Sequence, residues 1–282
     1  MQSLRQQGWM PRWALVVAAA AMVALVPLGM ALAAPQQADR LRVVASFYPM
    51  AYFAQQLGGD DVEVIQLVPV GVEPHEWEPT PRDMVTVQTA KVLVLNGAGL
   101  EGWADRVVPN LPADGPVVVT ATAGLPLLQG AEDDEDAGAW DPHTWLDPYL
   151  AQLEVQSILE GLVKADPARE ASYRSRARDL YQRLADLYYE ELVQLTGCPR
   201  TSFVTSHNAF QYLAKRFQLR SLYIAGLSPN EEPSPTRLAE LTKLLKRENV
   251  RYIYFETLAS PALAETLARE VGLQTLVLNP IE

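Results

Sequence analysis

The feature that most constrains this chain is a regular alternation of β-branched runs and helical segments, which begins at Arg42. Four runs precede residue 125, namely "LRVVASFY", "VEVIQLVPV", "KVLVLN" and "GPVVVTA". Segments with helical spacing separate them, at residues 48–59, 82–90 and 100–108. This alternation is typical of a parallel sheet with helices on its faces. Residues 34–148 are therefore predicted to form an α/β lobe.

The alternation returns in the last third of the chain. The runs "RTSFVTS", "LRSLYIAG", "VRYIYFET" and "QTLVLN" alternate with predicted helices at 208–217, 235–247 and 261–271. Residues 198–282 are therefore predicted to form a second α/β lobe. The predicted fold class is α/β, with two lobes that each contain a parallel sheet flanked by helices.

Residues 149–197 are predicted to be linking helices, of which the second is unusually long. Asp166 is expected to cap it, Pro167 to begin it and Gly197 to end it. One apolar stripe runs along it, formed by Tyr173, Ala177, Leu180, Leu184 and Leu187. About 29 residues at 1.5 Å each would span roughly 43 Å, more than one small lobe needs. We therefore expect a rigid spine helix that joins the two lobes.

The N-terminus differs in composition from the rest. Met1–Ala33 contains Arg5 and Arg12, no acidic residue, and then an apolar run that ends in an A-x-A pattern. These are the parts of a secretory signal peptide. The run is also about 20 residues long, so an uncleaved membrane anchor is the alternative. Both alternatives place the rest of the chain outside the cytoplasm.

Charge and cysteine content argue against nucleic-acid binding, an intramolecular disulfide and a thiolate metal site. The net charge is −11, which makes the chain a poor nucleic-acid binder. The acidic run at 131–138 is of a kind that is usually solvated. Cys198 is the single cysteine, so the chain forms no intramolecular disulfide, and Cys198 alone is no thiolate metal site.

The chain has only three histidines, and each follows or ends a predicted strand. His75 and His143 lie in proline-stiffened loops of the first lobe, and His207 closes the run "SFVTSH" in the second. Ligands of parallel α/β lobes bind outside the carboxyl ends of the strands, so the three could converge between the lobes. A single loop histidine is more often a surface or hydrogen-bonding residue than a ligand.

Four separated motifs carry a resemblance to a known family. "EPHEWEPT", "DPHTWLDP", "SHNAFQYLAKRFQL" and "GLSPNEEPSP" resemble, in order, signature stretches of the cluster A-I metal-binding solute-binding proteins of ABC transporters, in particular the zinc-uptake branch. The resemblance runs from about Arg42 to the last residue. It implies an exported, monomeric protein that captures Zn²⁺ as its transported ligand. It also implies delivery of the ion to a membrane permease driven by a cytoplasmic ATPase.

The resemblance also implies a ligand set. His75, His143 and His207 match the three histidine ligands of the family, and Glu282 in "LVLNPIE" matches its glutamate ligand. Manganese-type relatives have a carboxylate in place of the third histidine, whereas three imidazoles and one carboxylate suit zinc. Because relatives continue beyond this point, the second lobe is expected to be truncated, and Glu282 to carry a terminal carboxylate that could compete as a ligand.

Five further residues are candidates for supporting the site. Glu73, Asp141 and Asp147 could each accept a hydrogen bond from the second imidazole nitrogen of a ligand and so fix its tautomer. Helix capping or turn closure is an equally good interpretation of each, and Asp147 has the position of a cap. Trp77 and Trp145 could shield the site from water or could pack in the core.

Three other functions are alternatives to zinc transport. A manganese or other divalent-metal binding protein of the same transporter class differs only in its cargo. A zinc-dependent hydrolase or lyase would need an open coordination position and a general base, and neither is evident if Glu282 is a ligand. An adhesin would need an extended apolar patch or a repeat, which the sequence lacks. We therefore predict a transport protein and not an enzyme.

Overall fold

The structure of the chain is a computed structural model that describes residues 40–130, 138–248 and 250–282. Residues 39–282 form one compact unit. The predicted secretion signal at 1–33 and nearly all of the acidic run at 131–138 lie outside the described residues. Among the helices that are described, none is long and apolar enough to cross a membrane.

Eight strands are described, one in each of the eight predicted runs. They are β1 (Leu41–Ala45), β2 (Val62–Gln66), β3 (Val92–Leu95), β4 (Val117–Thr120), β5 (Ser202–Thr205), β6 (Arg220–Tyr223), β7 (Tyr252–Phe255) and β8 (Gln274–Val277). The helices are α1 (Tyr48–Gly58), α2 (Pro81–Gln88), α3 (Ala104–Val107), α4 (Pro148–Ala165), α5 (Glu170–Leu195), α6 (Gln211–Arg216), α7 (Pro235–Arg247) and α8 (Ala262–Val271). Short 3₁₀ turns include η4 (Thr144–Leu146) and η5 (Pro167–Arg169).

The strands form two parallel four-stranded sheets with the same topology. The first has the order β2-β1-β3-β4 and the second β6-β5-β7-β8. All pairs are parallel, with Val43 opposite Val64 and Val92 in the first sheet and Val204 opposite Leu222 and Ile253 in the second. The predicted two-lobed α/β fold is confirmed.

Apolar side chains cover the two faces of the first sheet. One cluster combines the sheet residues Val43 and Val94 with Leu57 of α1, Ile158 of α4 and Leu180 of α5. On the opposite face, a smaller cluster gathers around Trp103 with residues of β1 and β3. Fully buried aliphatic runs such as "VLVL" in β3 are expected for a parallel strand covered on both sides.

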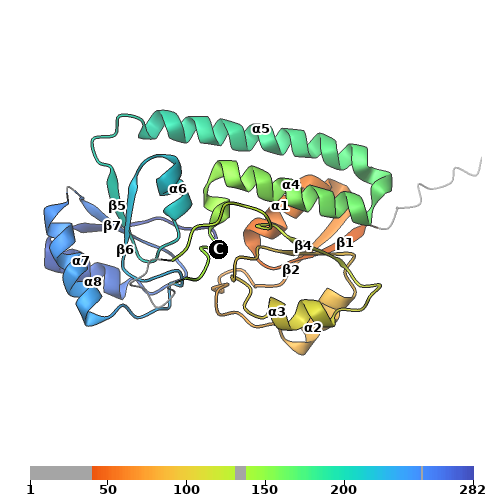
Figure 1. The fold of residues 1–282 in the computed structure, drawn as a ribbon, viewed down its shortest axis with the longest axis horizontal. Helices are drawn as coiled ribbons and strands as arrows, with labels where there is room; N and C mark the ends of the chain where they lie inside the picture. Colours follow the sequence, from red (N-terminus) through yellow and green to blue (C-terminus); the bar gives the residue numbers. More distant parts are fainter. Residues whose placement is uncertain (1–39, 131–137, 249) are drawn as a thin grey trace, which may run out of the picture. The chain divides into compact units, whose positions relative to one another are not determined.

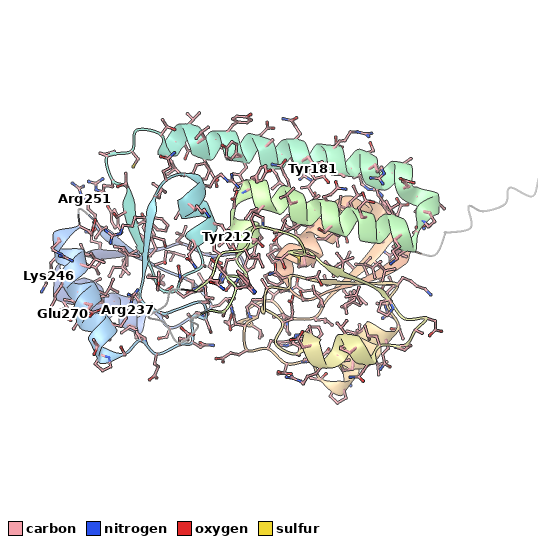
Figure 2. All side chains as sticks on the ribbon, viewed as in Figure 1. Tyr181, Tyr212, Arg237, Lys246, Arg251 and Glu270 are labelled. Atoms are coloured by element: carbon pink, nitrogen blue, oxygen red, sulfur yellow. The ribbon has the colours of Figure 1, made fainter. Side chains whose placement is uncertain are left out.

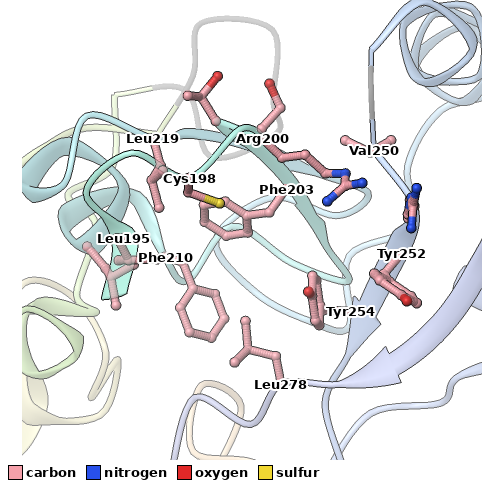
Figure 3. Close-up of a pocket in the computed structure, with 14 residues that line it drawn as sticks. Leu195, Cys198, Arg200, Phe203, Phe210, Leu219, Val250, Tyr252, Tyr254 and Leu278 are labelled. Carbon is pink, nitrogen blue, oxygen red and sulfur yellow. The ribbon is translucent and has the colours of Figure 1, made fainter. Parts of the chain in front are cut away.

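The second sheet has its core on the face covered by α7 and α8. Val204 and Ile253 are fully buried there against Leu241, Leu245 and Leu267. α6 lies near the other face, where Phe203, Tyr254 and Leu278 line a hollow of about 370 Å³ (Figure 3). None of the three histidines lines this hollow, so its position does not mark the candidate site.

The long helix α5 runs beside both lobes (Figure 1). Tyr173, Ala177 and Leu180 of the predicted stripe are buried against α1 and α4, whereas Leu187 is exposed. Further along, Tyr188 stacks on Phe217 of the second lobe with ring centroids 5.8 Å apart. The helix thus contacts both lobes, as predicted for a spine.

The start of this helix differs from the prediction. The α-helix begins at Glu170, after the 3₁₀ turn η5, and Asp166 makes no side-chain cap. Its carboxylate instead accepts hydrogen bonds from Arg169 Nη1 at 2.5 Å and from Tyr173 Oη at 3.0 Å. An arginine three residues away therefore replaces the backbone amide as the partner of Asp166.

Candidate metal centre

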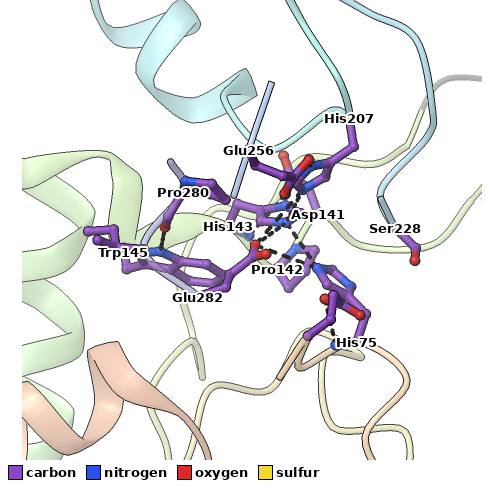
Figure 4. Close-up of polar contacts among 12 residues, drawn as sticks. His75, Asp141, Pro142, His143, Trp145, His207, Ser228, Glu256, Pro280 and Glu282 are labelled. Carbon is purple, nitrogen blue, oxygen red and sulfur yellow. Dashed lines mark hydrogen bonds and ion pairs between the residues drawn. The ribbon is translucent and has the colours of Figure 1, made fainter. Parts of the chain in front are cut away.

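All four predicted ligands come together at the carboxyl ends of the strands. His75 follows β2, His143 lies just before η4, His207 follows β5 and Glu282 follows β8. One ligand atom from each lies within 4.8 Å of the other three (Figure 4). The first lobe supplies two of these side chains and the second lobe supplies the other two.

The ring nitrogens face one another directly. His143 Nε2 lies 3.2 Å from Nε2 of His75 and 3.2 Å from Nε2 of His207. Glu282 Oε1 lies 3.7, 3.2 and 3.8 Å from the Nε2 atoms of His75, His143 and His207 respectively. The side chains of His143, His207 and Glu282 are 0–1% exposed and that of His75 is 10% exposed. The cluster is therefore almost closed to solvent, with its remaining access beside His75.

Carboxylates orient two of the three rings from behind. Asp141 Oδ1 accepts from Nδ1 of His143 at 2.7 Å and from its backbone amide at 3.0 Å. Glu256 Oε1 accepts from Nδ1 of His207 at 2.7 Å. When Nδ1 of a neutral imidazole carries the proton, the Nε2 lone pair is free. Both lone pairs therefore point toward the centre of the cluster.

Buried polar contacts hold the loop that carries His143. The Asn96 side-chain amide donates to the carbonyl oxygen of Pro142 at 2.9 Å. Glu101 accepts in turn from the backbone amides of Asn96 and Gly97, at 2.7 and 2.9 Å. On the other side of the histidine, the Thr144 hydroxyl donates to Glu154 of α4. These contacts fix the backbone on both sides of His143.

A strained backbone brings Glu282 into the cluster. Ile281 has φ of 58°, a left-handed conformation that is unusual for a β-branched residue. The side chain of Asn279 accepts from the Ile281 amide at 2.7 Å and stabilises this turn. The "LNP" segment after β8 thus turns the chain so that the Glu282 carboxylate faces the histidines.

Charge and burial shift the ionisation of the site in opposite directions. Burial disfavours the His143 imidazolium, but the hydrogen bond and charge of Asp141, with Glu282, outweigh it and raise the pKa of His143 to about 9. For Glu282, burial acts to raise the pKa, but hydrogen bonds to His143 and His75 hold it well below its usual range. Burial raises the pKa of Glu73. The cluster thus favours a bound positive charge.

The two tryptophans have different positions. The ring of Trp145 lies 5.3 Å from that of His143, and its Nε1 donates to the Pro280 carbonyl at 2.8 Å. Trp145 therefore covers one side of the cluster and is hydrogen-bonded to the segment that carries Glu282. Trp77 packs on Trp103 with centroids 6.1 Å apart, so core packing describes it better.

Of the three candidate acceptors, Asp141 alone contacts an imidazole among the described contacts. Glu73 accepts from the backbone amide of His75 at 3.0 Å and closes a turn. Asp147 caps α4 by accepting from the Tyr149 amide at 2.9 Å, and it pairs with Arg216 at 2.8 Å. Turn closure and capping are therefore the interpretations that fit Glu73 and Asp147.

Sequence reasoning missed Glu256, Asn96 and Glu101. The first polar residue after a buried strand is the signal that could have found two of them, since Glu256 follows β7 and Asn96 follows β3. Glu101 lies in the loop between β3 and α3, and no local pattern distinguishes it from a surface carboxylate.

Helix α6 of the second lobe contacts the loop of the first lobe that carries His143. The hydroxyl of Tyr212, a residue labelled in Figure 2, donates to the backbone oxygen of Asp141 at 2.7 Å and accepts from the Leu128 amide at 2.9 Å. The Gln211 amide donates to Asp141 Oδ2 at 3.1 Å. Two neighbouring residues of α6 thus hold the Asp141–His143 segment against the second lobe.

A two-lobed α/β fold with a closed His₃Glu cluster at its strand ends defines a class of protein that could hold a metal ion. Residues 43–282 match the family described as zinc-uptake complex component A periplasmic. The chain belongs to this family.

The names of two relatives refer to zinc. The high-affinity zinc uptake system protein ZnuA of Bacillus subtilis is 40% identical over 260 residues, which are 88% of this chain and 81% of that protein. The zinc-binding lipoprotein AdcA of Streptococcus pneumoniae is 38% identical over 257 residues, again 88% of this chain, but the chain spans only 51% of that relative.

A solved structure has a similar fold. The Zn(II)-bound ZnuA-like domain of AdcA from Streptococcus pneumoniae superimposes with a TM-score of 0.75 at 37% identity. The match covers 86% of this chain and 89% of that domain.

Proposed function

We propose that this protein captures Zn²⁺ outside the cytoplasm through His75, His143, His207 and Glu282, and delivers it to an ABC permease with a cytoplasmic ATPase. The observation that carries the proposal is the convergence of imidazole lone pairs and one carboxylate oxygen on a common centre. The names of the relatives, among them a zinc uptake system protein and a zinc-binding lipoprotein, support both the cargo and the location.

The spacing of the ligand atoms supports a tetrahedral ion. With Zn–N bonds of about 2.0–2.1 Å, ligand atoms at the corners of a tetrahedron lie about 3.3–3.4 Å apart. The separations of 3.2 Å between imidazole nitrogens and 3.2–3.8 Å to the carboxylate are close to this length. With both rings neutral and no cation between them, the Nε2 lone pairs of His143 and His207 would face each other at 3.2 Å and repel.

The donor set supports zinc over manganese. Three imidazoles and one carboxylate suit a borderline-soft, four-coordinate ion, whereas Mn²⁺ prefers more oxygen donors. His207 is decisive for this preference, because a carboxylate at its position would give a set with two nitrogens and two oxygens.

Closure of the site supports transport rather than catalysis. A catalytic zinc keeps one coordination position open for water or substrate. With zinc bound, the four proposed ligands would fill a tetrahedron, and Glu282 would take the position that an activated water needs. The side chain of Glu282 is 0% exposed, which fits a site built to hold an ion.

Native mass spectrometry of the metal-stripped protein, offered equal zinc and manganese, tests the proposal. We expect one tightly held zinc, lost in His143→Ala and weakened in Glu282→Gln. Glu248→Gln is the matched control, because Glu248 contacts Ser202 and Arg220 at the far end of β5 and should leave binding unchanged. A folded wild type that retains no zinc, or that retains manganese instead, would contradict the proposal.

A further inference from the structure

We infer that Glu256 is a positioning residue for metal capture, which holds His207 in the tautomer and orientation that present Nε2 to the ion. This inference rests on the proposed function. It concerns a residue that does not itself touch the ion but acts through a ligand.

The contacts of Glu256 are directed at the His207 segment. Glu256 follows β7 directly and is 2% exposed. One of its oxygens, Oε1, accepts from Nδ1 of His207 at 2.7 Å (Figure 4). The same oxygen accepts from the Ser206 hydroxyl at 2.5 Å. Two neighbouring donors therefore fix this oxygen behind the ring, on the side opposite Nε2.

The charge environment of Glu256 fits this role. In the described part of the chain, His207 is the one basic side chain that forms an ion pair with Glu256. A buried carboxylate without lysine or arginine is unfavourable unless another positive charge compensates it. A zinc ion on the far side of the His207 ring would provide that charge through the imidazole.

The same arrangement occurs once in each lobe. Asp141 contacts Nδ1 of His143 at 2.7 Å in the first lobe, and Glu256 contacts Nδ1 of His207 at 2.7 Å in the second. Each lobe thus presents one ring whose tautomer a carboxylate fixes. Removing Glu256 should therefore release the His207 ring and leave the ring of His143 held in place.

Zinc affinity of Glu256→Gln, measured by competition with a chromophoric chelator, tests the inference. Glutamine keeps the volume but removes the charge, and its amide can turn its donor group toward Nδ1. Loss of such a partner behind a metal-binding histidine typically weakens metal binding about 10–100-fold, and we expect this range here. Glu248→Gln removes a carboxylate from the same lobe without contacting an imidazole and should bind within about twofold of wild type.

Nuclear magnetic resonance provides a readout that a merely structural role would not change. In the zinc-loaded wild type, the His207 Nδ1 proton should exchange slowly with water, and in Glu256→Gln it should exchange faster while the His143 proton does not change. Thermal melting of both metal-free proteins monitors folding. If Glu256→Gln does not fold, the wild-type spectrum decides: a rapidly exchanging Nδ1 proton, or zinc bound through Nδ1, overturns the inference.

The outcomes separate the two proposals. A folded wild type that does not bind zinc contradicts the proposed function. A wild type that binds zinc, together with a folded Glu256→Gln that binds it equally well, overturns the role of Glu256 and leaves the proposed function intact.

Discussion

Glu154 lies fully buried in α4 beneath the loop that carries His143, and its ionisation should make the stability of the protein depend on pH. Burial, with a smaller contribution from the charge of Asp147, raises the pKa of Glu154 to about 8, against the opposing hydrogen bond from Thr144. The carboxyl is therefore mainly neutral in the folded protein at pH 7 and would be ionised in the unfolded chain.

The sign follows from this raised pKa. The folded state binds the proton more tightly than the unfolded state, so stability falls as the pH rises from the unfolded pKa near 4.5 through the folded pKa near 8. At about 1.4 kcal/mol per unit of pKa, Glu154 alone should cost about 2–3 kcal/mol of unfolding free energy between pH 6 and pH 9. Glu154→Gln keeps the acceptor for Thr144 but cannot ionise, so it should lose less stability over this range.

Urea unfolding of the metal-free wild type and Glu154→Gln at pH 6, 7.5 and 9 measures this difference. Contributions from all other groups cancel when the two proteins are compared at each pH. Glu160→Gln is the matched control. Glu160 lies on the same helix, its side chain is 50% exposed and it pairs with Arg174, so the variant should show the same pH dependence of stability as wild type. If the curves of wild type and Glu154→Gln run parallel, Glu154 is ionised in the folded state and the reasoning is refuted.

Three further predictions follow from contacts around the site. Asp141→Asn should weaken zinc binding about 10–100-fold in chelator competition, because it disturbs the Nδ1 partner of His143, and an unchanged affinity would refute this role. Arg216→Ala should lower the unfolding free energy by about 3 kcal/mol in urea, because it leaves the 3%-exposed Asp147 carboxylate without its cation; a loss below about 1 kcal/mol would contradict this. Crystal structures of the metal-free and zinc-bound protein should differ by less than about 1 Å in the lobe backbones, because α5 and α6 connect both lobes, and wide domain closure would contradict this.

Much of the fold could be predicted because its signals are local. Each β-branched run forms a strand. A continuous aliphatic stretch such as "VLVL" is buried on both sides when helices cover both faces of a parallel sheet. The start of α5 could not be predicted, because the partner of Asp166 is the Arg169 side chain rather than a backbone amide, and both arrangements fit the same residues.

For the site, strand-end position was the informative signal. His75, His143 and His207 each follow a strand or precede the next element, so the fold class indicated that they could converge. Glu256 follows the same rule but was missed, because a single glutamate after "YIYF" belongs to no motif. Its pairing with His207, 49 positions away, depends on the placement of β7 beside β5, which only the tertiary structure provides.

Zinc K-edge X-ray absorption on the protein loaded with one equivalent of zinc reads out the proposed ligand set itself. We expect four nitrogen or oxygen neighbours at about 2.0–2.1 Å, with the multiple-scattering pattern of three imidazoles, and a fall to two imidazoles in His207→Ala. Five or six oxygen-rich neighbours, or a wild-type pattern that His207→Ala does not change, would contradict a closed site of three histidines and Glu282.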